Sequence, residues 1–148
     1  MFKFLKSKKG FTLVELMIVV VIMAILVAVA VPIFSAVTKN ARTKTCIGNQ
    51  REIISSVGNW LMLQSDTSIA GSFTTTGGQD APAWGTFTGL DAHQDEIEGL
   101  FKTVPVCPDA AATITATIVA GSNGGKSTVT TKCENGENSA EHKVPGIN

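Results

Sequence analysis

Apolar residues are concentrated in one stretch near the amino terminus. Residues 16–31 are apolar without a break, and within residues 11–34 the only exceptions are Thr12, Glu15 and Pro32. A helix of that length extends about 36 Å, more than the roughly 30 Å hydrocarbon core of a bilayer. The pattern therefore predicts a membrane-spanning helix over residues 11–34 and argues against a soluble cytoplasmic protein.

The helical pattern continues beyond this span, over residues 35–64. Polar residues occupy one face there, and the apolar residues that recur at helical spacing on the other are Cys46, Ile47, Ile53, Ile54, Val57, Trp60 and Leu61. This spacing predicts an amphipathic continuation of the helix that ends near Gln64. Cys46 lies on the apolar face, where a core position is the simplest interpretation.

Residues 65–148 are expected to form a globular head. Residues 65–90 are rich in Ser, Thr and Gly, which predicts a long connecting loop with only local structure. Asp91 and Gln94 have the spacing of a capping box, which predicts a short helix over about residues 91–101.

A β-hairpin is predicted after this helix. Residues 113–119 alternate between polar and apolar, as a half-buried strand does, and residues 127–133 return with the Thr and Val that are typical of strands. Glycines supply the turn between them. The elements together predict an α+β fold, in which a long amino-terminal helix packs on a small antiparallel β-sheet at about residues 111–134.

Charge is distributed unevenly, although 12 basic residues balance 12 acidic ones. Residues 1–10 contain four lysines and no acid, whereas residues 65–148 contain ten acidic residues and four lysines. An acidic head argues against nucleic acid as the main partner.

The carboxylate of Glu15 is the exceptional group in the apolar segment. An acid at membrane depth costs on the order of 2.5 to 3.5 kcal/mol, so we expect a compensating group. A cut between Gly10 and Phe11 would create an α-amine four residues before Glu15, and the two charges attract strongly in a low dielectric. A secretory signal cleaved after Ala30 is the alternative, but the apolar stretch exceeds the usual length of about 7 to 15 residues.

The sequence from Lys8 to Ile18 resembles the processing signature of type IV pilins and related pseudopilins. This signature joins a basic leader, a glycine, a phenylalanine and an acid at a fixed offset within a membrane helix. The resemblance implies that a prepilin peptidase removes the leader, residues 1–10, by cleaving after Gly10, and that it methylates the amine of Phe11. It also implies that Glu15 meets the Phe11 amine of an adjacent subunit during filament assembly.

The same resemblance gives Pro32 a role. It matches a position at which the long helix of such proteins bends or loosens, so we expect a helix break there. The physical reason is that the nitrogen of Pro32 cannot donate a hydrogen bond to the carbonyl of Ala28.

The function implied by the resemblance is structural. The chain is expected to be a subunit, the major pilin, of an extracellular type IV pilus that serves adhesion, motility or biofilm formation. Its implied partners are further copies in a helical homo-polymer, the prepilin peptidase and the pilus assembly machinery, and the precursor is expected in the cytoplasmic membrane. A major pseudopilin of a type II secretion or DNA-uptake machine is the alternative.

Three cysteines are present, so at least one stays outside any disulfide within the chain. Cys107, which a proline follows, and Cys133 resemble the paired cysteines in the carboxy-terminal regions of some pilins, and this implies a disulfide between them. We favour buried thiols over this disulfide, because cysteine packs well as a small apolar residue.

No metal, cofactor or catalytic site is expected. A zinc site lacks any C-x-x-C or H-x-x-x-H spacing among its candidate ligands, which are Cys107, Cys133, His142 and either His93 or Asp109. The chain has two histidines and no G-x-S-x-G elbow, so we do not expect an enzyme.

Overall fold

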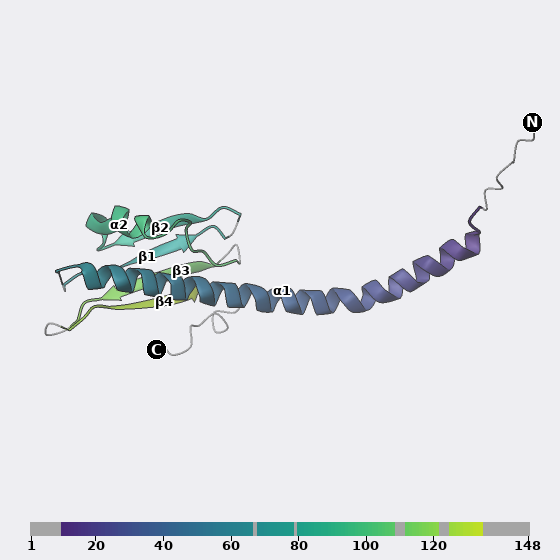
Figure 1. The fold of residues 1–148 in the computed structure, drawn as a ribbon, viewed down its shortest axis with the longest axis horizontal. Coiled ribbons are helices and arrows are strands. Elements are labelled where there is room, and N and C mark those ends of the chain that lie inside the picture. Colours follow the sequence, from purple (N-terminus) through teal and green to yellow (C-terminus); the bar gives the residue numbers. More distant parts are fainter. Residues whose placement is uncertain (1–9, 67, 79, 109–111, 122–124, 135–148) are drawn as a thin grey trace, which may run out of the picture. The chain divides into compact units, whose positions relative to one another are not determined.

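The computed structural model describes residues 10–66, 68–78, 80–108, 112–121 and 125–134 (Figure 1). Most of the leader and the end of the head, residues 135–148, lie outside the described residues. In chain order the elements are α1 (Leu13–Leu63), β1 (Gly71–Thr76), β2 (Ala83–Thr88), the 3-10 helix η1 (Asp91–His93), α2 (Gln94–Gly99), β3 (Thr113–Val119) and β4 (Thr128–Glu134). The fold is therefore α+β, as the sequence predicts.

Helix α1 runs without interruption from Leu13 to Leu63 and contains Pro32. Its end lies one residue before the predicted Gln64. The helix continues through Pro32, although proline removes one hydrogen bond of the helix backbone. A bend or loosening at this position stays a prediction.

The chain divides into two compact units, Met1–Lys39 and Asn40–Asn148, and α1 contributes to both. In the first unit every residue from Gly10 to Val37 is exposed, which includes the whole apolar segment. An exposed apolar surface of this extent requires an apolar environment outside the chain itself.

The second unit has its own hydrophobic core, to which α1 contributes one face. The buried residues of that face are Cys46, Gln50, Ile53, Val57 and Trp60. Four of these were predicted, and Ile47, Ile54 and Leu61 flank the face as half-buried residues. The helix therefore packs on the predicted face, whereas the polar Gln50 at its centre was not foreseen.

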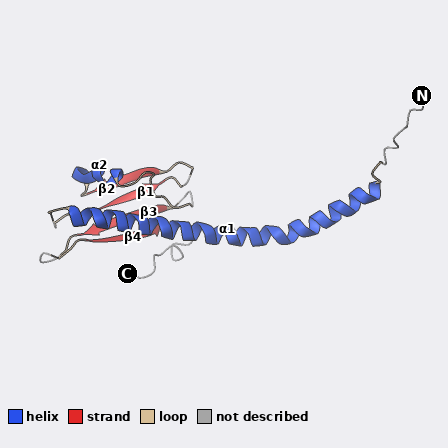
Figure 2. Ribbon diagram, in the orientation of Figure 1, coloured by secondary structure: helices blue, strands red, loops and turns tan. Residues whose placement is uncertain are grey.

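The core is closed by a four-stranded sheet of order β2-β1-β3-β4 (Figure 2). All neighbouring strands are antiparallel. The predicted hairpin is present as β3 and β4, in which Ile114 pairs with Cys133. Along β3 every second residue is buried, so Ile114, Ala116 and Ile118 face the core.

The long loop expected over residues 65–90 is wrong, because this segment contains strands β1 and β2. In β1 the side chains of Phe73 and Thr75 alternate inward, and in β2 the side chain of Phe87 is buried. Threonine and aromatic residues favour strands, but so few apolar positions leave the alternation weak. Ser, Thr and Gly also serve in turns, so this composition does not distinguish strands from a loop.

The capping box predicted at Asp91 is also wrong. A 3-10 turn occupies Asp91–His93 instead, and no side-chain hydrogen bond caps either η1 or α2. Ile97 of the short helix α2 is buried as expected, and Leu100 and Phe101 pack against the core after the helix ends.

Candidate functional site

The start of α1 carries a closed set of hydrogen bonds around Glu15. The backbone N–H and the hydroxyl of Thr12 each donate to the same carboxylate oxygen of Glu15, at 2.8 Å. In return the backbone N–H of Glu15 donates to the hydroxyl of Thr12 at 3.3 Å. This is a reciprocal capping box that begins the apolar helix.

This capping box is not among the features predicted from the sequence. Its signal was present, since a Thr followed three residues later by a Glu in front of an apolar run predicts such a cap. Thr12 therefore belongs to the candidate site together with Glu15, and it fixes where the carboxylate lies relative to the helix start.

The expected cleavage point lies directly before this cap. Gly10 and Phe11 are both exposed, and Phe11 is 81% exposed. A side chain added at Gly10 would meet no atom within 4 Å. The peptide bond between Gly10 and Phe11 is therefore accessible to another protein, and the rest of the leader, residues 1–9, lies outside the described residues.

The helix that follows can cross a membrane by its length and composition. Among the described residues α1 is the one helix that meets this criterion, and none of its most apolar window is buried. An uncleaved anchor and a signal sequence share these properties, so the identity of the segment depends on the residues around Gly10.

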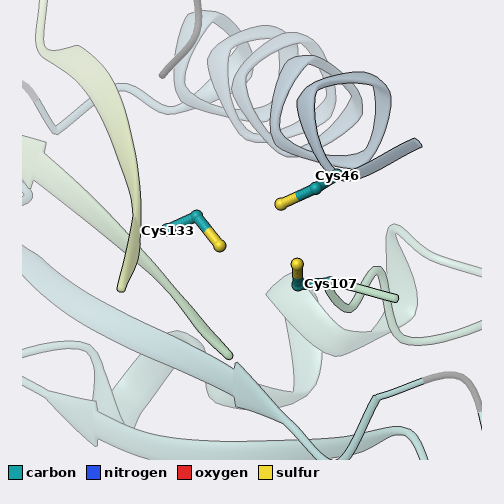
Figure 3. Close-up of side chains that lie close together, drawn as sticks. All are labelled: Cys46, Cys107 and Cys133. Carbon is teal, nitrogen blue, oxygen red and sulfur yellow. The ribbon is translucent and has the colours of Figure 1, made fainter. Parts of the chain in front are cut away.

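A second candidate site lies in the head, where three cysteines converge (Figure 3). Cys46 comes from α1, Cys107 from the segment before β3, and Cys133 from β4. All three are buried, and their Sγ atoms lie within 4.8 Å of one another. No disulfide joins these three cysteines in the structure, and the Cys107–Cys133 bond stays a prediction about the oxidised protein.

Hydrogen bonds from two elements position Cys107. Asn49 of α1 donates its side-chain amide to the carbonyl of Val106 at 2.6 Å. The buried hydroxyl of Thr75 in β1 donates to the carbonyl of Pro105 at 2.8 Å. The two carbonyls just before Cys107 are thus held by the helix and by the sheet, which sets the place of its sulfur.

Gln50 lies one helical turn beyond Cys46 and is fully buried. Its side-chain nitrogen donates to the sulfur of Cys46 at 3.5 Å. Its side-chain oxygen accepts a hydrogen bond from the hydroxyl of Thr131 in β4 at 3.2 Å. Because the oxygen accepts from Thr131, the amide nitrogen is the group that faces the sulfur of Cys46.

The environment of the cluster favours the protonated forms of Cys46 and Cys133. A hydrogen bond with Cys107, followed by burial, raises the pKa of the Cys46 thiol to about 12. Hydrogen bonds with Cys107 and Cys46, together with burial, raise the pKa of Cys133 as well. Cys46 and Cys133 are therefore neutral thiols at neutral pH.

Among the described residues, the other ligand considered for a zinc site is His93, and it does not join the cluster. His93 lies against the ring of Trp60, with ring centroids 5.4 Å apart, and 3.7 Å from the carboxylate of Glu96. Asp109 and His142 lie outside the described residues. The cysteine that completes the cluster is Cys46, which the sequence analysis assigned to the core because helical spacing alone gave it no partner.

A known family motif is recognised at the amino terminus of the chain. The family model of the prokaryotic N-terminal methylation motif matches residues 5–31. This motif is the class III signal peptide of type IV pilins, and it implies processing by a prepilin peptidase and pilus-type assembly in general. No solved structure matches the chain.

Proposed function

We propose, from the premise that residues 5–31 carry the N-terminal methylation motif of type IV pilins, that this chain is a structural subunit of an extracellular type IV pilus. It would be the major subunit, in a filament that serves adhesion, motility or biofilm formation. Its partners would be further copies of itself, the prepilin peptidase and the assembly machinery of the membrane. The observation that carries the proposal is this motif on an apolar helix that the chain itself leaves exposed.

Processing would change the chemistry at the start of α1. Cleavage after Gly10 removes the leader and leaves a charged amine on Phe11, four residues before Glu15. A positive charge at the amino end of a helix is unfavourable, and a carboxylate close to it relieves the cost. The capping box already holds the Glu15 carboxylate at the helix start. The amine of a neighbouring subunit can therefore approach a carboxylate that is fixed in place.

Assembly would be driven by the apolar segment of α1. While the precursor is in the membrane, lipid covers the exposed side chains of residues 11–34. In a filament, neighbouring helices would cover them instead. The pair formed by Glu15 and the Phe11 amine would fix the axial position of each subunit, because any other offset leaves a buried charge without its counter-charge.

A major pseudopilin of a type II secretion or DNA-uptake machine is the second candidate. Both kinds of subunit use the same motif. The acidic excess of residues 65–148 supports a filament displayed to the surroundings. Long surface fibres in electron micrographs of the native cells would support the pilus, whereas short fibres confined to the envelope would favour the pseudopilus.

The deciding experiment is intact-mass and amino-terminal analysis of the protein recovered from its native cell surface. We expect a chain that begins at Phe11 with a methylated amine. A chain that begins at Val31 would indicate ordinary secretory cleavage, and one that begins at Met1 would indicate an uncleaved anchor. Either result would overturn the proposal in favour of a secreted or anchored domain.

A further inference from the structure

The buried cysteine cluster has a geometry that the proposed assembly role does not explain. Three sulfur atoms from three separate elements point into one common space (Figure 3) and lie within 4.8 Å of one another. A zinc ion bound at about 2.3 Å from each sulfur holds three sulfurs about 4 Å apart. Small side-chain adjustments therefore bring this cluster to the spacing of a three-thiolate metal site.

We propose that Cys46, Cys107 and Cys133 together bind one thiophilic metal ion, with Zn²⁺ as the occupant. Each cysteine would supply one thiolate sulfur, and water can fill the fourth position of a tetrahedral ion. Binding would release the three thiol protons to the solvent. The site lies wholly within the unit Asn40–Asn148, so it does not depend on processing or on filament assembly.

A disulfide accounts for less of the geometry than a metal ion does. A disulfide between Cys107 and Cys133 would bring two sulfurs to about 2.05 Å and would give the third no role. Here the sulfur of Cys46 is as much a part of the cluster as the other two. Hydrogen bonds from Asn49 and Thr75 hold the segment that leads to Cys107. The whole triangle of sulfurs is therefore built into the fold.

Gln50 supplies an outer contact that a metal site at this cluster would use. A fully buried amide in an apolar core is costly unless its groups are used. Thr131 orients this amide so that a donor faces the Cys46 sulfur. An N–H group directed at a ligand sulfur stabilises a thiolate and is the kind of outer contact that metal sites use.

A bound ion would add a direct link between three elements that packing and side-chain hydrogen bonds already hold together. Cys46 lies near the beginning of the packed part of α1, Cys107 precedes β3, and Cys133 lies near the end of β4. A metal bound by these cysteines would connect α1 to the segment before β3 and to the end of β4. Binding to the folded state alone raises the free energy of unfolding.

The test uses the full-length chain, purified in detergent without oxygen and stripped of metal with a chelator. Zn²⁺ is added and the metal retained per chain is measured. Cd²⁺ is then titrated while the thiolate-to-metal absorption is followed. We expect one equivalent of either ion per chain, and we expect the bound ion to protect all three cysteines from alkylation.

Four substitutions and one control sharpen the result. Cys46→Ser, Cys107→Ser and Cys133→Ser should each weaken binding by about tenfold or more, and Gln50→Leu should weaken it by about ten- to hundredfold. Val57→Ala is the matched control, because it disturbs the same buried helix face and keeps all three thiols. This variant should still bind one equivalent of metal per chain.

Three results would overturn the proposal. The first is that the wild-type chain retains no Zn²⁺ and shows no Cd²⁺ absorption, a measurement that does not depend on the folding of any variant. The second is that Cys46→Ser binds as tightly as the wild type. The third is a native chain lighter by two hydrogens, with a Cys107–Cys133 disulfide and only Cys46 open to alkylation after unfolding.

Discussion

Glu15 has one role in the local structure of its own helix and a second role in the proposed filament assembly. Its carboxylate accepts two hydrogen bonds from Thr12 within one chain, and it would also pair with the Phe11 amine of another chain. The first role needs an oxygen acceptor, whereas the second needs a negative charge. Substitutions at Glu15 and Thr12 separate the two roles.

Glu15→Gln removes the charge and keeps an oxygen that can accept from Thr12. We expect normal membrane insertion and normal cleavage, with a filament yield at least about tenfold lower, because the buried amine loses its counter-charge. Glu15→Ala should behave in the same way. The measurement is the amount of sheared surface filament relative to total protein.

Thr12→Val is the matched control for Glu15→Gln. It removes the capping hydroxyl at a cost of about 1 kcal/mol to the helix start and keeps the charge of Glu15. It should reduce filament yield much less than Glu15→Gln does. Wild-type filament levels from Glu15→Gln would contradict the charge pair as the determinant of axial position.

Recognition of Gly10 by the prepilin peptidase can be tested by substitution without disturbing the fold. No atom lies within 4 Å of a side chain added there. We therefore expect Gly10→Leu to insert into the membrane and to retain its leader, because the peptidase must accept the residue before the scissile bond. Intact mass of the membrane fraction checks this, and efficient cleavage of Gly10→Leu would count against the processing site.

At the scale of the elements, Thr75 links strand β1 to the segment that carries Cys107. Its buried hydroxyl donates to the carbonyl of Pro105. Thr75→Val has nearly the same shape and leaves that carbonyl without the bond, so we expect a loss of about 1 to 3 kcal/mol in the free energy of unfolding. Denaturant unfolding of the full-length chain in detergent measures it.

The control for this substitution is Thr128→Val, at an exposed position of β4. It should change the free energy of unfolding by less than about 0.5 kcal/mol. Equal effects of the two substitutions would mean that β propensity, rather than the buried hydrogen bond, determines the result.

The elements also differ in how far the sequence predicted them. The β3–β4 hairpin was predicted because Ile114, Ala116 and Ile118 alternate regularly with threonines. Strands β1 and β2 were missed because each has few inward apolar residues. Phe73 and Phe87, whose rings stack with centroids 5.5 Å apart, are the buried aromatic residues of these two strands. Their contact crosses two strands and has no periodic signal along the chain.

At the scale of the whole molecule, the chain combines one unit that exposes its apolar residues with a second unit that buries them in a core. Residues 10–37 are entirely exposed and largely apolar, while the unit Asn40–Asn148 has a core of its own. We therefore expect a chain that begins at Asn40 to stay soluble without detergent and to unfold cooperatively. Light scattering after gel filtration and thermal unfolding by circular dichroism test this.

The result for this shortened chain shows whether the head folds without the apolar half of α1. Aggregation, or the absence of a cooperative transition, would show that the head needs the apolar half of α1 to fold. The full-length chain is the control, and it should require detergent because of its exposed apolar segment.

The sequence by itself determined the features that depend on neighbours along the chain. The apolar run, the acid at Glu15 and the glycine before Phe11 predict a membrane helix with a processing site, and the same residues carry the methylation motif. The amphipathic face of α1 and the β3–β4 hairpin also follow from local periodicity, which records burial at 3.6 or two residues per repeat.

Only the tertiary structure decided which distant residues meet. Cys46, Cys107 and Cys133 are separated by 61 and 26 positions in the sequence, and their sulfurs converge because the helix, the segment before β3 and strand β4 pack around one point. The pairing of β1 with β3 and the burial of Gln50 likewise depend on contacts between residues far apart in the sequence. Such contacts depend on loop closure and side-chain packing in three dimensions, and no local pattern encodes them.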